Sequence, residues 1–351
     1  MNPLTTEGKS SLVKLASLVI IVAGMKAASS LIVPFILAVF LAIICAPLLF
    51  WLQRRGIPEL LGLLMILALV VGLWLMLAML VSTALSEFSR NVPYYQDRLN
   101  LILRSLLAWL AGYGISIDSA LVVEILNPGK IMKLIGGTLN GLGGMLTNAF
   151  LILLTFVFLL LEAAGIPDKI RAIRGNSENS LDEYVEITSG VNRYLAMKTL
   201  TSLSTALVIY LFLSLQNVDF AILWAIFAFL LNFVPNIGSI IAAIPAVLIA
   251  LIQLGPLNAL ITAIGYLVVN IIIGSIVEPR VMGKSVGLST LVVFLSLTFW
   301  GWVLGPVGML LSVPLTMTVK IALSGNESTR WIGLLLGSTK DVSFYLKQHQ
   351  K

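Results

Sequence analysis

The sequence predicts an all-α, polytopic membrane protein, because it is too apolar for a soluble fold. Of its 351 residues, 59% are hydrophobic and only 11% are charged, whereas a soluble domain is about half apolar and about a quarter charged. The apolar residues fall in long runs, and a helix needs about 20 such residues to cross a bilayer. We therefore expect about 8 transmembrane segments in a lipid bilayer, some of them broken or re-entrant helical hairpins.

The same composition excludes several classes of function. A net charge of +6 fits lysines and arginines placed at the ends of spans, so we expect no nucleic-acid partner. The glycines from Gly136 to Gly144 lack the lysine and the spacing of a phosphate-binding loop. The single cysteine, Cys45, lies in an apolar run, and the single histidine, His349, lies in a polar tail. We expect no enzyme activity, no metal site and no cofactor.

Residues 1–85 are expected to form three spans. The apolar stretch 12–53 is long enough for two helices, and the segment from Met25 to Ser30 divides it. A short basic turn from Gln53 to Pro58 then leads into a third apolar run at 60–85. Two helices, a basic turn and a third helix therefore open the chain.

Two polar segments flank a fourth span, which is expected at 142–163. The first segment, 86–141, has leucines and isoleucines at the spacing of one helix face. We expect an extracytoplasmic amphipathic helical insert, which is an interfacial helix, a subunit-contact arm or a cap on the protein's own spans. The second segment, 164–197, contains Ser180 followed by Glu183, a capping-box pattern. We expect it to be a cytoplasmic amphipathic helix that leads into the next span.

Residues 198–323 are expected to form a C-terminal membrane core, and 324–351 a cytoplasmic tail. Two apolar stretches of this core are too long for one upright helix, and each contains a break rich in glycine and proline. Each is either two spans or a re-entrant helical hairpin. The apolar stretches of the core are 199–215, 220–253, 257–277 and 289–323.

Basic residues at short flanks predict the orientation of the chain. Lys9 and Lys14 precede or open the first span, and Arg54 and Arg55 lie between the second and third spans. Short loops rich in lysine and arginine remain in the cytoplasm. Each broken stretch crosses the bilayer either twice or not at all, and both alternatives leave the C-terminus on the same side. We therefore expect both termini to be cytoplasmic.

The segment around Glu278 is the first candidate for a functional site. An ionisable side chain in the bilayer costs about 2.5–3.5 kcal/mol, so those that are kept often mark a pathway. Glu278-Pro279-Arg280 follows an apolar run directly, and Pro279 is expected to disfavour helix at Glu278. The acid and the guanidinium could form a salt bridge at a helix end, bind a cation or contact a polar solute. Glu278 is the best candidate for proton or cation coupling.

A second candidate is the uncharged polar break in the stretch 220–253. Asn232, Pro235, Asn236 and Gly238 interrupt an apolar run there. Unwound backbone at membrane depth is tolerated where it lines a cavity, and it is common at transporter sites. The alternative is an ordinary loop between two spans. Asn270, in the next apolar stretch, is expected to face the same cavity. Residues expected only to break helices or to allow their close packing are Pro279, Gly283, Gly301, Gly305, Pro306 and Gly308.

These motifs resemble the autoinducer-2 exporter family. The resemblance is carried by Asn232-Phe233-Val234-Pro235-Asn236-Ile237-Gly238, by Glu278-Pro279-Arg280-Val281-Met282-Gly283 and by the stretch from Leu291 to Thr316. The resemblance covers residues 12–323. The run from Glu278 to Lys320 is especially similar to the enterobacterial members of the family. The resemblance implies that 198–323 is a transport core in a bacterial inner-membrane protein. The implied activity is export of the small polar quorum-sensing signal autoinducer-2, which would affect biofilm formation and motility.

The resemblance leaves other functions open. Some similar proteins are described as sodium(lithium)/proton antiporters, and that activity would use Glu278. A third alternative is a membrane scaffold that transports nothing. Similar proteins are thought to assemble as homo-oligomers, with a pentamer as the expected size.

Overall fold

The part of the chain that the structure describes is a set of helices, with an isolated β-bridge between Leu288 and Gly337. The computed structural model describes residues 3–113, 149–163, 178–235, 237–282, 287–325 and 328–338, together with positions 129, 136, 137, 165 and 169. Six of the described helices are long and apolar enough to cross a membrane, and four shorter helices are also apolar. The prediction of an all-α, polytopic membrane protein is therefore confirmed.

The N-terminal helices pack through small residues. Helix α1 (Pro3–Ala27) and helix α2 (Ser29–Arg54) are separated at Ala28, within the segment that was expected to divide them. Helix α6 (Ala149–Ala163) packs against α2. Their shared apolar cluster combines alanines of α2 with large side chains of α6, and the free thiol of Cys45 is buried in it. The alanines let α6 lie close to the backbone of α2.

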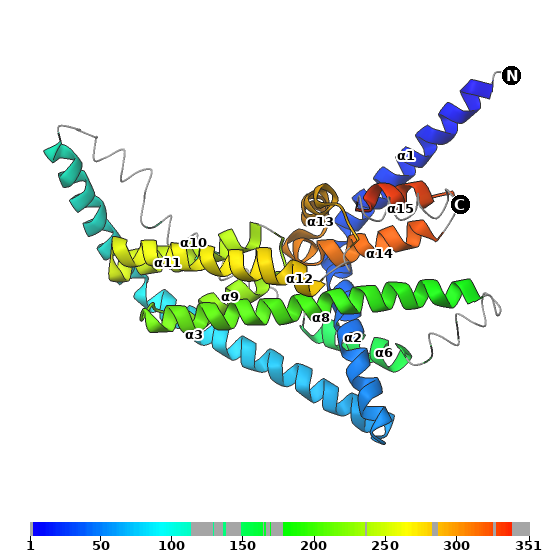
Figure 1. The fold of residues 1–351 in the computed structure, drawn as a ribbon, viewed down its shortest axis with the longest axis horizontal. Helices are drawn as coiled ribbons and strands as arrows, with labels where there is room; N and C mark the ends of the chain where they lie inside the picture. Colours follow the sequence, from blue (N-terminus) through cyan, green and yellow to red (C-terminus); the bar gives the residue numbers. More distant parts are fainter. Residues whose placement is uncertain are drawn as a thin grey trace.

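Helix α3 (Glu59–Gly112) is one continuous element of 54 residues. Such a helix is about 80 Å long, more than twice the thickness of the hydrocarbon core. The predicted boundary between a span and an insert at residue 86 is therefore not a helix end. Polarity rises there, but the residues still favour helix, and Tyr95, Leu99 and Leu103 remain buried on one face. Figure 1 shows α3 extending past the end of α8 (Glu178–Leu215).

Helix α8 joins two segments that the sequence divides by polarity. The predicted cytoplasmic helix ends at 197 and the next apolar stretch begins at 199, but no helix end lies between them. The part of α8 suited to cross a membrane begins at Ser189. Ser180 and Glu183 lie in its first turns, and the side chains of these turns are outside the described part of the chain.

Helices α9 (Ala221–Leu231) and α10 (Ile237–Leu254) form a hairpin that returns to its starting side. Gln253, near the end of α10, accepts a hydrogen bond from the backbone N–H of Asp219 and donates to the Asp219 carboxylate and the Asn217 carbonyl. With 11 residues, α9 is about 16 Å long and reaches about halfway through the hydrocarbon core. The contacts bring the two ends of the hairpin together, as both alternatives for this stretch, two spans or a re-entrant hairpin, require, and α10 is long enough to cross a membrane.

A π-helix interrupts the span after this hairpin. Helix α11 (Pro256–Val269) continues into the π-helix η1 (Asn270–Val277) and then into α12 (Glu278–Met282). The expectation that Pro279 disfavours helix at Glu278 is wrong, because Glu278 has φ −56° and ψ −50°. Pro279 lies in the first turn of α12, where a missing N–H is tolerated.

A second hairpin is formed by α13 (Thr290–Leu310) and α14 (Ser312–Ser324). The indole N–H of Trp300 donates to the Thr316 hydroxyl, with 3.0 Å between the two atoms. The Lys320 ammonium donates to the Gly287 carbonyl at 2.5 Å, so α14 returns to the start of α13. The short helix α15 (Arg330–Leu336) covers α14. This stretch therefore also folds as a helical hairpin, and its bend lies between Gly305 and Leu311.

Both hairpins bring their bends to the middle of α8. Figure 1 shows α9 beside one half of α8 and α14 beside the other half, and both helices contact α8. One apolar cluster joins Val191 and Leu195 of α8 to Val307 and Leu311 at the second bend. At the first bend, Asn232 contacts Ser202 of α8. Lys198 thus lies on α8 between the positions that contact the two bends.

Candidate functional site

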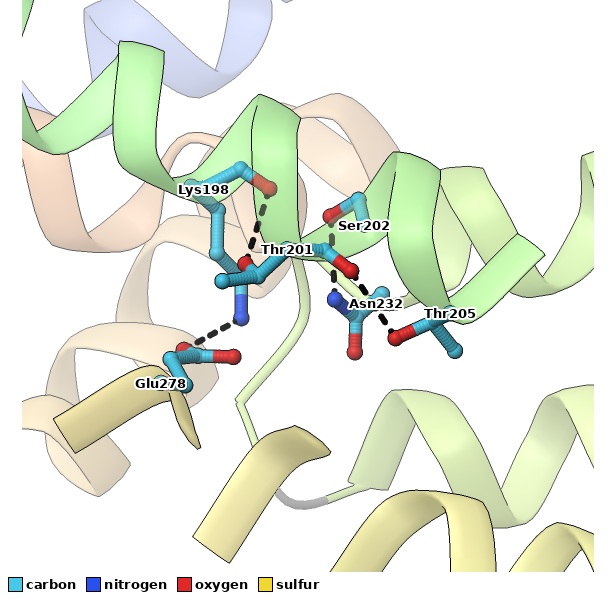
Figure 2. A network of polar contacts seen from close by, with 6 residues as sticks. All are labelled: Lys198, Thr201, Ser202, Thr205, Asn232 and Glu278. Carbon is cyan, nitrogen blue, oxygen red and sulfur yellow. Dashed lines mark hydrogen bonds and ion pairs between the residues drawn. The ribbon is translucent and has the colours of Figure 1, made fainter. Parts of the chain in front are cut away.

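One face of α8 is polar although it is buried. Lys198, Thr201, Ser202 and Thr205 recur at helical spacing, and all four residues are buried. The Thr201 hydroxyl donates to the Lys198 carbonyl at 3.1 Å, and the Thr205 hydroxyl donates to the Thr201 carbonyl at 3.0 Å. Figure 2 shows these side chains on consecutive turns. Both threonine donors are satisfied within the helix, so the face is polar without a buried unpaired hydroxyl.

An ion pair connects this face to α12. The Lys198 ammonium lies 2.6 Å from a carboxylate oxygen of Glu278, and the two side chains are only 4% and 18% exposed. Figure 2 shows the two groups pointing toward each other from separate helices. A charge with so little access to water is tolerated when an opposite charge compensates it. The pair therefore holds two charges inside the core with no net charge.

An uncharged hydrogen bond connects the same face to the first hairpin. Asn232, at the end of α9, donates through its side-chain amide to the Ser202 hydroxyl at 2.9 Å. Asn232 and Ser202 are both buried. The bend of the hairpin is therefore tied to α8 next to the ion pair, as Figure 2 shows.

Pro235 and Gly238, two other predicted residues of the first bend, shape the turn between α9 and α10. Pro235 accepts a hydrogen bond from the N–H of Ile237 at 2.7 Å, which closes the turn. A Cβ on Gly238 would lie 1.8 Å from the Leu231 carbonyl oxygen. Glycine is required here because α10 begins against the end of α9. Asn236 lies outside the described residues.

Asn270 and Arg280 do not join the network on α8. Asn270 begins η1 and lines a groove of about 370 Å³ between α10 and α11, together with Ser239 and Tyr266. Arg280 is exposed, and the partner of Glu278 is Lys198. A salt bridge between Glu278 and Arg280 was one of the predicted alternatives, and the structure has a different pairing.

The predicted glycines of the second hairpin lie around its bend. Gly305 has φ 69° and ψ −154°, a conformation that residues with a side chain rarely adopt, and Pro306 follows it. A Cβ on Gly308 would lie 2.0 Å from the Trp300 carbonyl oxygen, and one on Gly301 would lie 2.7 Å from Met309. These residues form a tight bend. Gly283 lies outside the described part of the chain.

Four residues of the network were missed at the level of the sequence. Lys198 lies at the first position of the predicted core 198–323, just before its first apolar stretch begins at residue 199, so it did not stand out as a charge within a span. Thr201, Ser202 and Thr205 lie in the apolar stretch 199–215, whose mean hydropathy does not reveal single polar residues. The signal that could have found them is their spacing, because positions i, i+3, i+4 and i+7 share one helix face.

The arrangement suits a polar solute better than a metal ion. The network offers hydroxyl and amide groups beside a compensated ion pair, all at the meeting point of two hairpins. Within the described ranges, no group of three or more histidine, cysteine, aspartate or glutamate side chains could hold a metal ion. Unwound or broken helices around a buried polar site are typical of transporters.

Comparisons with known proteins agree with this architecture. The model of the AI-2E family transporter matches residues 15–325. The AI-2 transport protein TqsA of Escherichia coli (strain K12) is 39% identical over 333 residues, which are 95% of this chain and 97% of that protein. A putative transport protein of Haemophilus influenzae is 37% identical, over 94% of this chain and 97% of its own length. The putative transport protein YhhT of E. coli (strain K12) is 37% identical over 96% of each chain. This chain is a multi-pass membrane protein that belongs to the AI-2E transporter family.

Proposed function

We propose that this protein exports autoinducer-2, a small polar signal, through the polar network on α8. The observation that carries the proposal is a buried network, without net charge, at the place where two helical hairpins meet. Uncharged hydroxyl and amide groups can hydrogen-bond a sugar-like solute and do not require it to carry a charge. The similarity to a relative named as an AI-2 transport protein supports this choice of solute.

The proposal includes the cellular setting of the transporter. We infer that it works in the bacterial inner membrane with both termini in the cytoplasm, as a homo-oligomer with the size of a pentamer. Residues 86–141 would then form an extracytoplasmic insert, and residues 164–197 and 324–351 would be cytoplasmic. Export would lower the internal signal and so affect biofilm formation and motility.

Removal of the hydrogen bond between Ser202 and Asn232 tests the solute path. We expect Asn232→Ala to lower autoinducer-2 export at least about fivefold, because it removes an amide from the path and unties the bend from α8. Internal and external signal would be measured in deletion cells that carry wild type or the variant. Ser204→Ala is the control, because Ser204 is an exposed serine on the same helix that donates to the Leu200 carbonyl within its own helix. Equal internal signal in deletion cells and in cells with wild type would contradict export.

Cation/proton antiport is a second candidate function. The buried pair of Lys198 and Glu278 favours it, because a cation could replace the ammonium at the carboxylate. This function predicts that Glu278→Gln abolishes sodium-dependent proton flux in vesicles, whereas Glu162→Gln, at an exposed pair, leaves the flux unchanged. Absence of such flux in wild-type vesicles over a broad pH range would eliminate antiport.

A further inference from the structure

A second polar depression lies at the far end of α8 from the ion pair. It has a volume of about 580 Å³ and lies between α3 and the turn that joins α8 to α9. This volume is within the range of small-molecule sites, about 300–1,000 Å³. Leu215, the last residue of α8, lies 17 positions after Lys198, which places the turn about 26 Å along α8 from Lys198. The depression is therefore separate from the network that contains Lys198.

The α3 wall of this depression carries polar side chains that have no partner among the described residues. Thr83, Glu87, Arg90 and Asn91 follow one another at the spacing of a single helix face, and all four line the depression. All four are exposed. None of them forms a hydrogen bond or an ion pair with another described residue, although Glu87 and Arg90 are one turn apart. One acceptor, one strong donor, an amide and a hydroxyl are thus free to bind a ligand.

The opposite wall is held in place by hydrogen bonds. The Asp219 carboxylate accepts one bond from the Tyr95 hydroxyl at 2.8 Å and one from the Gln253 amide at 3.0 Å. The Trp224 indole N–H donates to the Asp219 carbonyl at 2.9 Å. Phe220, the next residue, has φ 59° and lines the depression, and its ring packs edge-on against Phe88 and Tyr95. The turn is therefore a fixed surface, which combines the hydrogen-bonded carboxylate of Asp219 with the apolar side chain of Phe220.

We propose that this depression is a second solute site, which binds an uncharged polyhydroxylated molecule. The Glu87 carboxylate would accept from hydroxyl groups, the Arg90 guanidinium and the Asn91 amide would donate to them, and Phe220 would cover the apolar face of the molecule. The charges of Glu87 and Arg90 cancel, and both oxygens of the Asp219 carboxylate already accept hydrogen bonds, so the groups that remain free suit the hydroxyls of a neutral solute better than an anion. The choice of autoinducer-2 as the solute rests on the proposed function.

Protection of an introduced thiol tests the site directly. In a Cys45→Ala background, Thr83→Cys places a thiol in the depression, and Ser89→Cys places one on the other side of α3. Purified protein in detergent would be labelled with a maleimide, with and without autoinducer-2. We expect autoinducer-2 to slow the labelling of position 83 at least about fivefold and to leave the labelling rate of position 89 unchanged. Adding Glu87→Gln with Arg90→Gln should remove the protection, while the rate at position 89 reports that the fold is intact.

The outcomes separate this site from the proposed function. Transport of autoinducer-2 in vesicles without protection at position 83 would overturn the site and leave the function standing. Protection without transport would support the site and contradict the export function. Protection by serine, a zwitterion, but not by autoinducer-2 or ribose would overturn the assignment to polyhydroxylated solutes.

Discussion

Replacing Lys198 by methionine is expected to abolish transport and to destabilise the protein by about 3–5 kcal/mol, because Glu278 would be left buried without a counter-charge. Replacing both residues, as Lys198→Met with Glu278→Gln, should recover most of the stability, since no uncompensated charge remains. Transport should stay lost in the double variant if the ion pair takes part in the cycle. Thermal unfolding in detergent and solute flux in vesicles measure the two effects separately.

Lys169→Met is the matched control for this experiment. Lys169 pairs with Glu162, but the two side chains are 65% and 52% exposed, and an exposed pair contributes about 0–1 kcal/mol. Its loss should change neither unfolding nor flux measurably. If Lys198→Met were as stable as Lys169→Met, the pair would not be a buried, mutually compensating contact. If it also transported normally, the network on α8 would not be the path.

Replacing Gly238 by alanine is expected to be the most damaging small substitution in the first hairpin. The added Cβ would lie 1.8 Å from the Leu231 carbonyl oxygen and 2.7 Å from its carbonyl carbon. Backbone atoms cannot move aside as a flexible side chain can, so the bend must open. We expect a loss of at least about 3 kcal/mol, at the upper end of the range for overpacking. Asn232 would then move away from Ser202, and transport would fall with stability.

Gly72→Ala is the control for Gly238→Ala. Gly72 lies within α3, and a Cβ there meets nothing within 4 Å. Alanine favours helix over glycine by about 1 kcal/mol, so this variant should be as stable as wild type or more stable. Yield of monodisperse protein, melting temperature and flux would be compared for the two variants. Gly238→Ala with wild-type stability would show that the bend is less tightly packed than its geometry indicates.

The elements of the fold could largely be predicted from local features of the chain. Apolar composition predicted the membrane class, and the break between α1 and α2 lies where polar and small residues interrupt an apolar run. The helices α3 and α8 are longer than predicted. Hydropathy detects a change of solvent along a helix, and a helix can continue through that change when its residues still favour it.

The candidate site could be predicted only in part. Asn232 and Glu278 were predicted because each is a polar residue beside a break in an apolar run. Lys198 was not, because it lies at the edge of its run, and its partner is 80 residues away in the chain. Arg280 was the partner suggested by proximity in sequence. A side chain two residues along a helix points to a different face, which is why Arg280 does not reach Glu278.

Composition and motifs are local properties of the chain, so they were enough to predict an all-helical membrane protein and its resemblance to a transporter family. The tertiary structure was needed to show that α9 and α10 return to one side, because this depends on the hydrogen bonds between Gln253 and Asp219. It alone paired Lys198 with Glu278 between the two bends. Burial makes a charge costly wherever it occurs, but which opposite charge compensates it depends on how separate helices pack.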